Sequence, residues 1–242
     1  MTGRPRRVAR RLAFVAGLIA LGAVAAVYVP PSPPREPSRC FGTSSNGRIE
    51  NAVALPLSGP NFSAYADIAR RLGRTYVHDR VQRVVLAAYA ELETTQPGQH
   101  FVYAETGGPR GGPFPPHRTH QNGLAVDFHV PVRDAQSRPA ALPLNPLNRY
   151  GYDLEFDAEG RLGERRIDFA AINAHLLALD AAARAEGIVV ERVIFDPSYL
   201  PKLYAAERGS EVRRRVRFMP RPAWVRHDEH YHVDFGLRCE PG

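Results

Sequence analysis

Two short stretches rich in histidine constrain this chain more than any other feature of its sequence. The first runs over 117–130 and the second over 227–235. Six of the nine histidines fall inside them, although the two stretches lie far apart along the chain. Histidines used for packing or for surface polarity would not gather in this way. The clustering therefore predicts a metal site that folding assembles from two distant segments.

The first stretch ends in a predicted β-strand over 124–130. Its even-numbered residues are apolar and would face a core, which puts Asp127 and His129 on the opposite face. The Asn122-Gly123 pair directly before this strand permits a tight turn. We expect that turn to swing His120 back over Asp127.

The second stretch predicts another strand, over 230–235, with three polar residues on the face opposite the core. These residues are His230, His232 and Asp234. Two such strands lying side by side would bring imidazoles against a carboxylate. His120, Asp127 and His232 then supply two nitrogens and one carboxylate oxygen, a set that suits Zn²⁺ and leaves a fourth position for water. That arrangement is typical of catalytic rather than structural zinc.

At this point the residues resemble a known family. His120-x6-Asp127 followed downstream by His230-x-His232 is similar to the zinc motif of D-Ala-D-Ala peptidases and hedgehog-type domains. The fuller wording, HxxHQxGLxxD at 117–127 and HxxHxHV at 227–233, resembles the penicillin-insensitive murein endopeptidases. Weaker sequence similarities extend the resemblance over 40–242. One departure is Ala125, where that family is expected to carry a further acid; the three primary ligands are intact.

The resemblance implies a zinc metallopeptidase that hydrolyses peptidoglycan cross-links between D-alanine and meso-diaminopimelate. Zinc would polarise the scissile carbonyl and lower the pKa of its bound water to about 7. His230 is the first candidate for the base that takes the water proton, and His227 is the second. His117 is either an additional metal contact or a neighbour of the ligands. Likewise, His129 and Asp234 either orient ligands or belong to the plain surface.

Two other functions fit the same ligands. A D,D-carboxypeptidase that trims terminal D-Ala would present an identical set, and a non-catalytic cell-wall binding domain would keep the zinc without turnover. The presence of His230 argues against the binding domain. The basic run 213–217, with Arg221 and Arg226, is either a solvated face or a source of contacts to substrate carboxylates.

The charge of the chain does not indicate a nucleic-acid partner. The formal net charge is +7, but five arginines fall within the first 11 residues, which contain no acid. Without these five of the 32 basic residues, 27 remain against 25 acidic ones, a net charge of only +2. No nucleic-acid-binding motif accompanies them. Cross-linked peptides of peptidoglycan are the expected partner.

The early arginines are followed by an uncharged apolar run over 12–29. We interpret 1–29 as a signal peptide or an N-terminal membrane anchor, and 30–39 as a proline-rich linker. Both alternatives place the zinc metallopeptidase domain, 40–242, in the periplasm, because arginines at the N-terminal end of an apolar segment stay on the cytoplasmic side of the membrane. In that oxidising compartment Cys40 and Cys239 are expected to pair.

Elsewhere the sequence predicts short helices and short strands. Asp168 is a candidate N-cap, and the segment 44–60 is rich in turn formers and is expected on the surface. The predicted elements are helices over 79–94, 168–187 and 197–207, a strand over 100–105, a central strand over 188–195, and a hairpin over 154–167 turning at 158–160. This mixture favours an α+β domain with a small, mainly antiparallel sheet that carries the zinc site and is flanked by helices.

Overall fold

The computed structural model describes residues 36–242. The predicted signal or anchor, 1–29, and most of the predicted linker, 30–39, lie outside these residues. Within 36–242 we find no helix whose length and hydropathy would let it cross a bilayer.

Strands and short helices follow one another along the chain. The strands are β1 (Arg39–Thr43), β2 (Asn46–Glu50), β3 (Val53–Ala54), β4 (Phe62–Ala64), β5 (Tyr76–Val77), β6 (Phe101–Tyr103), β7 (Ala125–His129), β8 (Val132–Arg133), β9 (Pro139–Ala140), β10 (Arg161–Leu162), β11 (Arg165–Ile167), β12 (Val189–Ile194) and β13 (His230–Gly236). The helices are α1 (Asp79–Thr95), α2 (Phe169–Ala185), α3 (Leu200–Ala205) and α4 (Gly209–Arg215), with 3₁₀ segments η1 (Asp67–Ala69), η2 (Pro146–Gly151) and η3 (Pro197–Tyr199).

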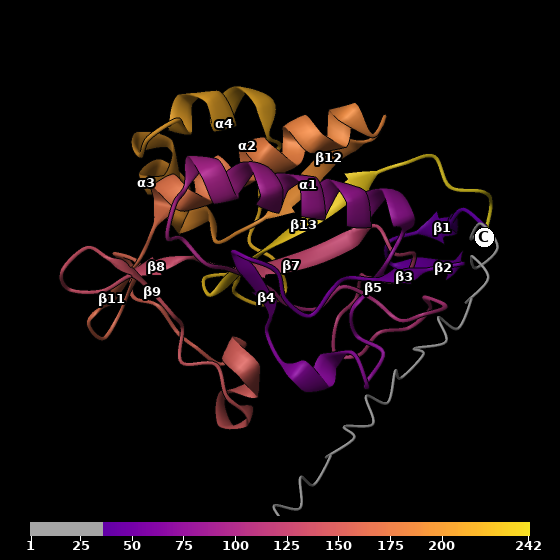
Figure 1. Cartoon of the computed structure of the whole chain (residues 1–242), viewed down its shortest axis with the longest axis horizontal. Coiled ribbons are helices and arrows are strands. Elements are labelled where there is room, and N and C mark those ends of the chain that lie inside the picture. Colours follow the sequence, from indigo (N-terminus) through magenta and orange to yellow (C-terminus); the bar gives the residue numbers. More distant parts are fainter. Residues whose placement is uncertain (1–35) are drawn as a thin grey trace, which may run out of the picture. The chain divides into compact units, whose positions relative to one another are not determined.

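A five-stranded sheet in the order β12-β13-β7-β6-β4 forms the centre of the domain. Its neighbours are antiparallel except β4 and β6, which run parallel. Helices α1 and α2 lie together on one side of this sheet, and the long connections that include η1 and η2 lie on the other (Figure 1). The predicted α+β domain with a mainly antiparallel sheet is confirmed.

Both long helices bury a continuous stripe against the sheet. The stripe of α1 is Val81, Val84, Val85, Ala88, Tyr89 and Leu92. Helix α2 begins where predicted, because the Asp168 side chain accepts a hydrogen bond from the Ala171 amide and so satisfies a free N–H of the first turn. His175 of α2 stacks on Tyr89 and meets Phe128 of β7 edge-on, which fits its assignment to ordinary structure.

Three sequence predictions are wrong in detail. Strand β12 is an edge strand rather than a central one, since its apolar residues face the helices while Val189 stays exposed. The hairpin of β10 and β11 turns at 163–164, not 158–160. The earlier turn exists, but there Asp157 accepts backbone hydrogen bonds in a local loop. The segment 44–60 is also more ordered than expected, because β2 and β3 belong to it and Leu55 is buried.

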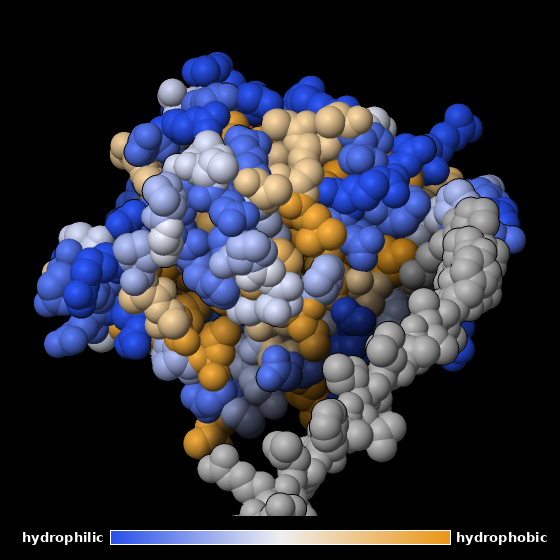
Figure 2. All heavy atoms as spheres, viewed as in Figure 1, coloured by the Kyte–Doolittle hydropathy of each residue, from blue (hydrophilic) through white to orange (hydrophobic). Residues whose placement is uncertain are grey.

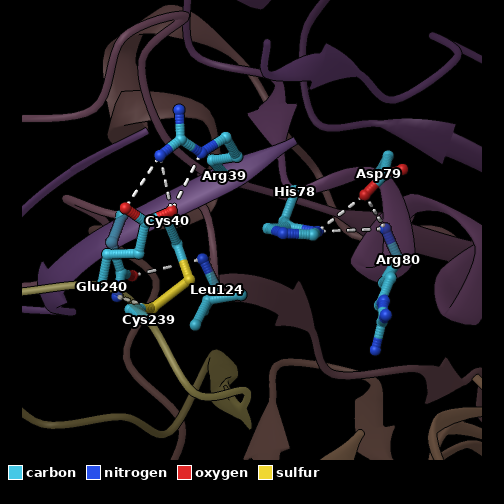
Figure 3. The surroundings of a disulfide bond; sticks show 9 residues. Arg39, Cys40, His78, Asp79, Arg80, Leu124, Cys239 and Glu240 are labelled. Atoms are coloured by element: carbon cyan, nitrogen blue, oxygen red, sulfur yellow. Dashed lines mark hydrogen bonds and ion pairs between the residues drawn. A yellow bond between two sulfur atoms is a disulfide. The ribbon is translucent and has the colours of Figure 1, made fainter. Parts of the chain in front are cut away.

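Cys40 and Cys239 form the expected disulfide, joining β1 to the segment that follows β13 (Figure 3). Beside it the Glu240 amide donates to the Cys40 carbonyl, the Gly42 amide donates to the Glu240 carbonyl, and Arg39 pairs with the Glu240 carboxylate. The bond closes a loop with a sequence separation of 199 residues. It therefore ties the start of the domain to the end of the strand that carries His230 and His232.

We predict that replacing Cys40 and Cys239 together with alanine lowers the free energy of unfolding by about 4–5 kcal/mol, the value that the chain-entropy model gives for so long a loop. Urea unfolding of the variant and of the oxidised parent would measure the difference. The parent reduced with dithiothreitol is the matched control and should show the same loss. A difference below about 1 kcal/mol would mean that the loop is already held closed by other contacts.

Candidate active site

Strands β7 and β13 lie side by side and bring the two histidine stretches together. Their antiparallel register sets His232 opposite Asp127 and His230 opposite His129. Between them, Val126 and the apolar residues of β13 face the helices, so the polar side chains share the other face of the sheet. The juxtaposition that alternation predicted is therefore present. The polar face is buried rather than solvated, since Asp127 is only 1% exposed.

His120 approaches Asp127 from the turn before β7. Both His120 and Gly123 have positive φ, 69° and 77°, which reverses the chain within a few residues. His120 Nδ1 donates a hydrogen bond to the Thr106 carbonyl at 2.8 Å, which leaves Nε2 as the ring nitrogen that faces the site. That Nε2 lies 3.3 Å from Asp127 Oδ1, is fully buried, and has no hydrogen-bond partner among residues 36–242.

An unpaired buried nitrogen facing a carboxylate oxygen is the arrangement that a cation would complete. A buried polar atom without a partner costs free energy, and in a neutral ring Nε2 and Oδ1 would both be acceptors with nothing between them. A metal ion would accept both lone pairs. The hydrogen bond to Thr106 also agrees with metal chemistry, because ligating histidines commonly donate their other N–H to a backbone carbonyl or a carboxylate.

His232 completes the group from β13. Its Nδ1 lies 2.8 Å from Asp127 Oδ1, and its Nε2 lies 2.9 Å from Asp234 Oδ1, whose carboxylate is paired with Arg192. Burial lowers the pKa of His232, but the Asp234 and Asp127 carboxylates outweigh it and raise that pKa to about 10. Asp234 is thus a buried partner of His232, and its alternative assignment to the plain surface is wrong.

His117 lies on the other side of Asp127. Its Nδ1 is 3.8 Å from Asp127 Oδ2, and its side chain is mostly buried. His117, His120 and Asp127 each offer a ligand atom within 4.8 Å of the other two. Among residues 36–242 these three form the group whose ligand atoms lie so close together; His232 is not part of it and is joined to it through its contact with Asp127 Oδ1.

His230 and His227 stand next to this group. His230 Nδ1 lies 2.6 Å from Glu229 Oε1, and its Nε2 points to Asp127 Oδ2 at 3.8 Å. Burial lowers the pKa of His230 to about 4 and raises the pKa of Glu229 to about 8. His227 donates from Nδ1 to the Val225 carbonyl, and its ring lies 4.5 Å from that of His230.

The predicted site residues open into one cavity of about 190 Å³. Its lining includes all three histidines of the second motif, together with His117 and Asp127; His120 lies behind them, fully buried. Two lining residues, Arg149 of η2 and Trp224, have exposed side chains and therefore lie where the cavity meets solvent, at its mouth. The site is thus a recess with histidines and a carboxylate at its base and an opening to solvent.

Comparison with known proteins agrees with this geometry. The family model of the penicillin-insensitive murein endopeptidases matches residues 40–242, which is most of the chain. The chain belongs to this family. A search of curated proteins found no match. Membership makes the chain a peptidase of the cell wall.

Two residues of this murein endopeptidase site were missed by sequence reasoning. Tyr152, which follows η2, donates to Asp127 Oδ2 at 2.8 Å and accepts from the Glu105 amide at 3.1 Å. It therefore fixes the second oxygen of the central carboxylate. Glu229 orients His230 and stands inside the second motif, so its position there was an available signal. No pattern around Tyr152 distinguishes it from other loop tyrosines.

Other sequence alternatives are also resolved. His129 is 2% exposed, so its assignment to the plain surface is wrong; both ring nitrogens lie within hydrogen-bond distance of backbone carbonyls, those of Glu229 and Tyr150. His227 is buried in the cavity wall rather than facing solvent.

Two of the six arginines in the basic run form ion pairs, and the other four are exposed, as in a solvated face. Arg215 pairs with Asp180, and Arg226 pairs with Asp196 and Asp228. Helix α4, which carries Arg213 to Arg215, lies in a region that is hydrophilic in the space-filling view (Figure 2). Of this run, only Arg226 lines the cavity, and its carboxylate partners occupy it.

Proposed function

We propose that this family member is a zinc-dependent endopeptidase that hydrolyses the bond between D-alanine and meso-diaminopimelate in peptidoglycan cross-links. The observation that carries the proposal is the buried, unpaired Nε2 of His120 facing the Asp127 carboxylate. The family supplies the class of substrate, and the opening at Arg149 and Trp224 gives a peptide access to the site.

His120 Nε2, Asp127 Oδ1 and His232 Nδ1 are the proposed metal ligands, and His117 is a further contact. Two nitrogens and one carboxylate oxygen fit zinc, which takes such sets in catalytic sites. Their outer partners support this assignment, because Thr106 and Asp234 hold the remaining ring nitrogens of His120 and His232. When bound, zinc acts as a Lewis acid toward the scissile carbonyl and makes water a nucleophile near neutral pH.

His230 is the proposed base. Glu229 holds its Nδ1, which turns Nε2 toward Asp127 and the base of the cavity. A base needs both reach and a fixed orientation, and His230 has both. His227 is the second candidate, since its Nδ1 is committed to the Val225 carbonyl and its ring adjoins His230. Tyr152 keeps Asp127 Oδ2 occupied, so that Oδ1 faces His120 and His232.

The reaction is tested with purified muropeptides. Cross-linked dimers should be split to monomers, chelator should abolish the reaction, and added Zn²⁺ should restore it, because the proposed zinc lowers the pKa of the attacking water. Release of D-Ala from pentapeptide monomers with dimers left intact would indicate a D,D-carboxypeptidase instead. Binding of either peptide without turnover would indicate a wall-binding domain.

Zinc content and turnover, measured on the same preparations, test the assigned roles. Replacing His120, Asp127 or His232 with alanine should remove zinc and activity together. His230→Ala should keep near-stoichiometric zinc while turnover falls on the order of 10²- to 10⁴-fold, the usual contribution of a general base. His117→Ala should weaken zinc binding without abolishing it. A folded His230→Ala protein that lacks zinc would make His230 a ligand.

We further propose that the domain works in the periplasm, after export directed by residues 1–29. The family's cell-wall substrate and the disulfide both support a site outside the cytoplasm. A reporter fused after Gly242 and active only in an oxidising compartment should be active in cells. The same fusion without residues 1–29 is the control and should be inactive. Activity of both fusions, or of neither, would contradict export by this segment.

A further inference from the structure

One arginine at the mouth of the cavity, Arg149, is not held by any buried acid of the site. Among residues 36–242, two arginines line this cavity, Arg149 and Arg226. Arg226 is committed: its guanidinium pairs with Asp196 at 2.7 Å and donates to the Phe156 carbonyl. Arg149 has one carboxylate contact, 3.2 Å to Asp153, and the two side chains are 59% and 45% exposed. An exposed pair of this kind contributes little free energy, so a ligand carboxylate could replace Asp153.

A strained turn holds Arg149 at this position. Arg149 and Tyr150 both have left-handed backbones, with φ of 48° and 55°. This conformation costs on the order of 1–3 kcal/mol for each residue that is not glycine, and it persists only where its surroundings impose it. Here the side chains of Asn145 and Asn148 form a reciprocal capping box across the turn. The side-chain oxygen of Asn148 also accepts a hydrogen bond from the Gly151 backbone amide.

The same turn sets three contacts in the site. It puts Arg149 at the mouth, directs the Tyr150 carbonyl to His129, and delivers the Tyr152 hydroxyl to Asp127. Unlike the charged Arg149, Trp224 and Val225 are large apolar side chains. They line the same cavity and are 44% and 54% exposed. The mouth thus joins a cation with an apolar wall, which suits a ligand that has both a carboxylate and aliphatic groups.

We propose that Arg149 is a specificity-determining residue that binds the free carboxylate beside the scissile bond, with Trp224 and Val225 against the aliphatic part of the same residue. This inference rests on the proposed function. Diaminopimelate has two α-carbons, one toward each end, and each bears an amine and a carboxyl group. When one amine forms the cross-link to D-Ala, the carboxylate on that carbon stays free, one atom from the scissile nitrogen. Arginine is well suited to it, because its planar guanidinium can bind a carboxylate through two parallel hydrogen bonds.

Binding can be measured separately from hydrolysis. Trp224 is the only tryptophan in the chain and lines the cavity, so its fluorescence should report occupancy. The full chain carrying His230→Ala, which slows turnover, would be titrated with two cross-linked dimers. One has the diaminopimelyl carboxylate next to the cross-link free, and the other has it amidated. Arg149→Gln in this background should weaken binding of the free-acid dimer by roughly 10- to 100-fold, the contribution of a charged hydrogen bond, and should leave the amidated dimer unaffected.

Two further variants make the test selective. Arg138 also forms an exposed i,i+4 pair, with Asp134, but lies outside the cavity lining, so Arg138→Gln should bind both dimers like the parent. Asp153→Asn leaves the strained turn untouched and frees Arg149, so it should tighten binding of the free-acid dimer by about 2- to 5-fold. This variant keeps the inference testable if Arg149→Gln fails to fold.

The outcomes separate this inference from the proposed function. Equal binding of the free-acid and amidated dimers by the parent, or equal losses for both in Arg149→Gln, would overturn the role of Arg149 and would point to recognition through Trp224 alone. Failure of the active parent to split a dimer that it binds with the predicted preference would overturn the endopeptidase reaction while supporting the carboxylate site. Absence of any binding would overturn the inference.

Discussion

The site depends on one buried carboxylate, that of Asp127. At 1% exposure it would be costly to ionise alone, since an unpaired charge loses its hydration on burial. Burial does raise its pKa, but His120 and His230 outweigh this effect and hold the pKa of Asp127 well below its usual range. Each of its oxygens has a separate task. Oδ1 meets His120 and His232, while Oδ2 accepts the Tyr152 hydroxyl.

Much of this arrangement could be predicted from sequence because it is recorded in short-range patterns. Alternation over β7 and β13 gives each side chain a face, and histidine spacing indicates that those faces meet. The polar face of Asp127 is buried, however, because loops and η2 cover it, and alternation alone cannot distinguish a covered face from a solvated one. Tyr152 and Arg149 could not be predicted either. They reach the site through a turn set by Asn145 and Asn148, which has no periodic signature.

The disulfide also joins segments that are far apart in the sequence, and it lies close to the site. Cys239 follows β13 closely, so its bond to Cys40 anchors the end of the strand that carries His230 and His232. Asn122, in the turn between His120 and β7, donates its side-chain amide toward the Cys239 sulfur at 3.7 Å. The turn that carries His120 and the strand that carries His230 and His232 are therefore both connected to the Cys40–Cys239 bond. Alternation and helical periodicity predict none of this, although two cysteines in a domain that the sequence predicts to be exported do predict the bond.

Arginines around the site divide into those that pair with buried acids and one, Arg149, that pairs with an exposed acid. Several neutralise buried acids that touch the histidine cluster or its neighbours: Arg192 pairs with Asp234, Arg74 with Glu105, and Arg226 with Asp228. Without these cations, acids that far from water would tend to protonate and would orient their partners poorly. The arginine-rich composition thus has a structural use within this domain. Arg149 differs because its pair with Asp153 is exposed, so its charge remains open to a ligand at the one place where the cavity reaches solvent.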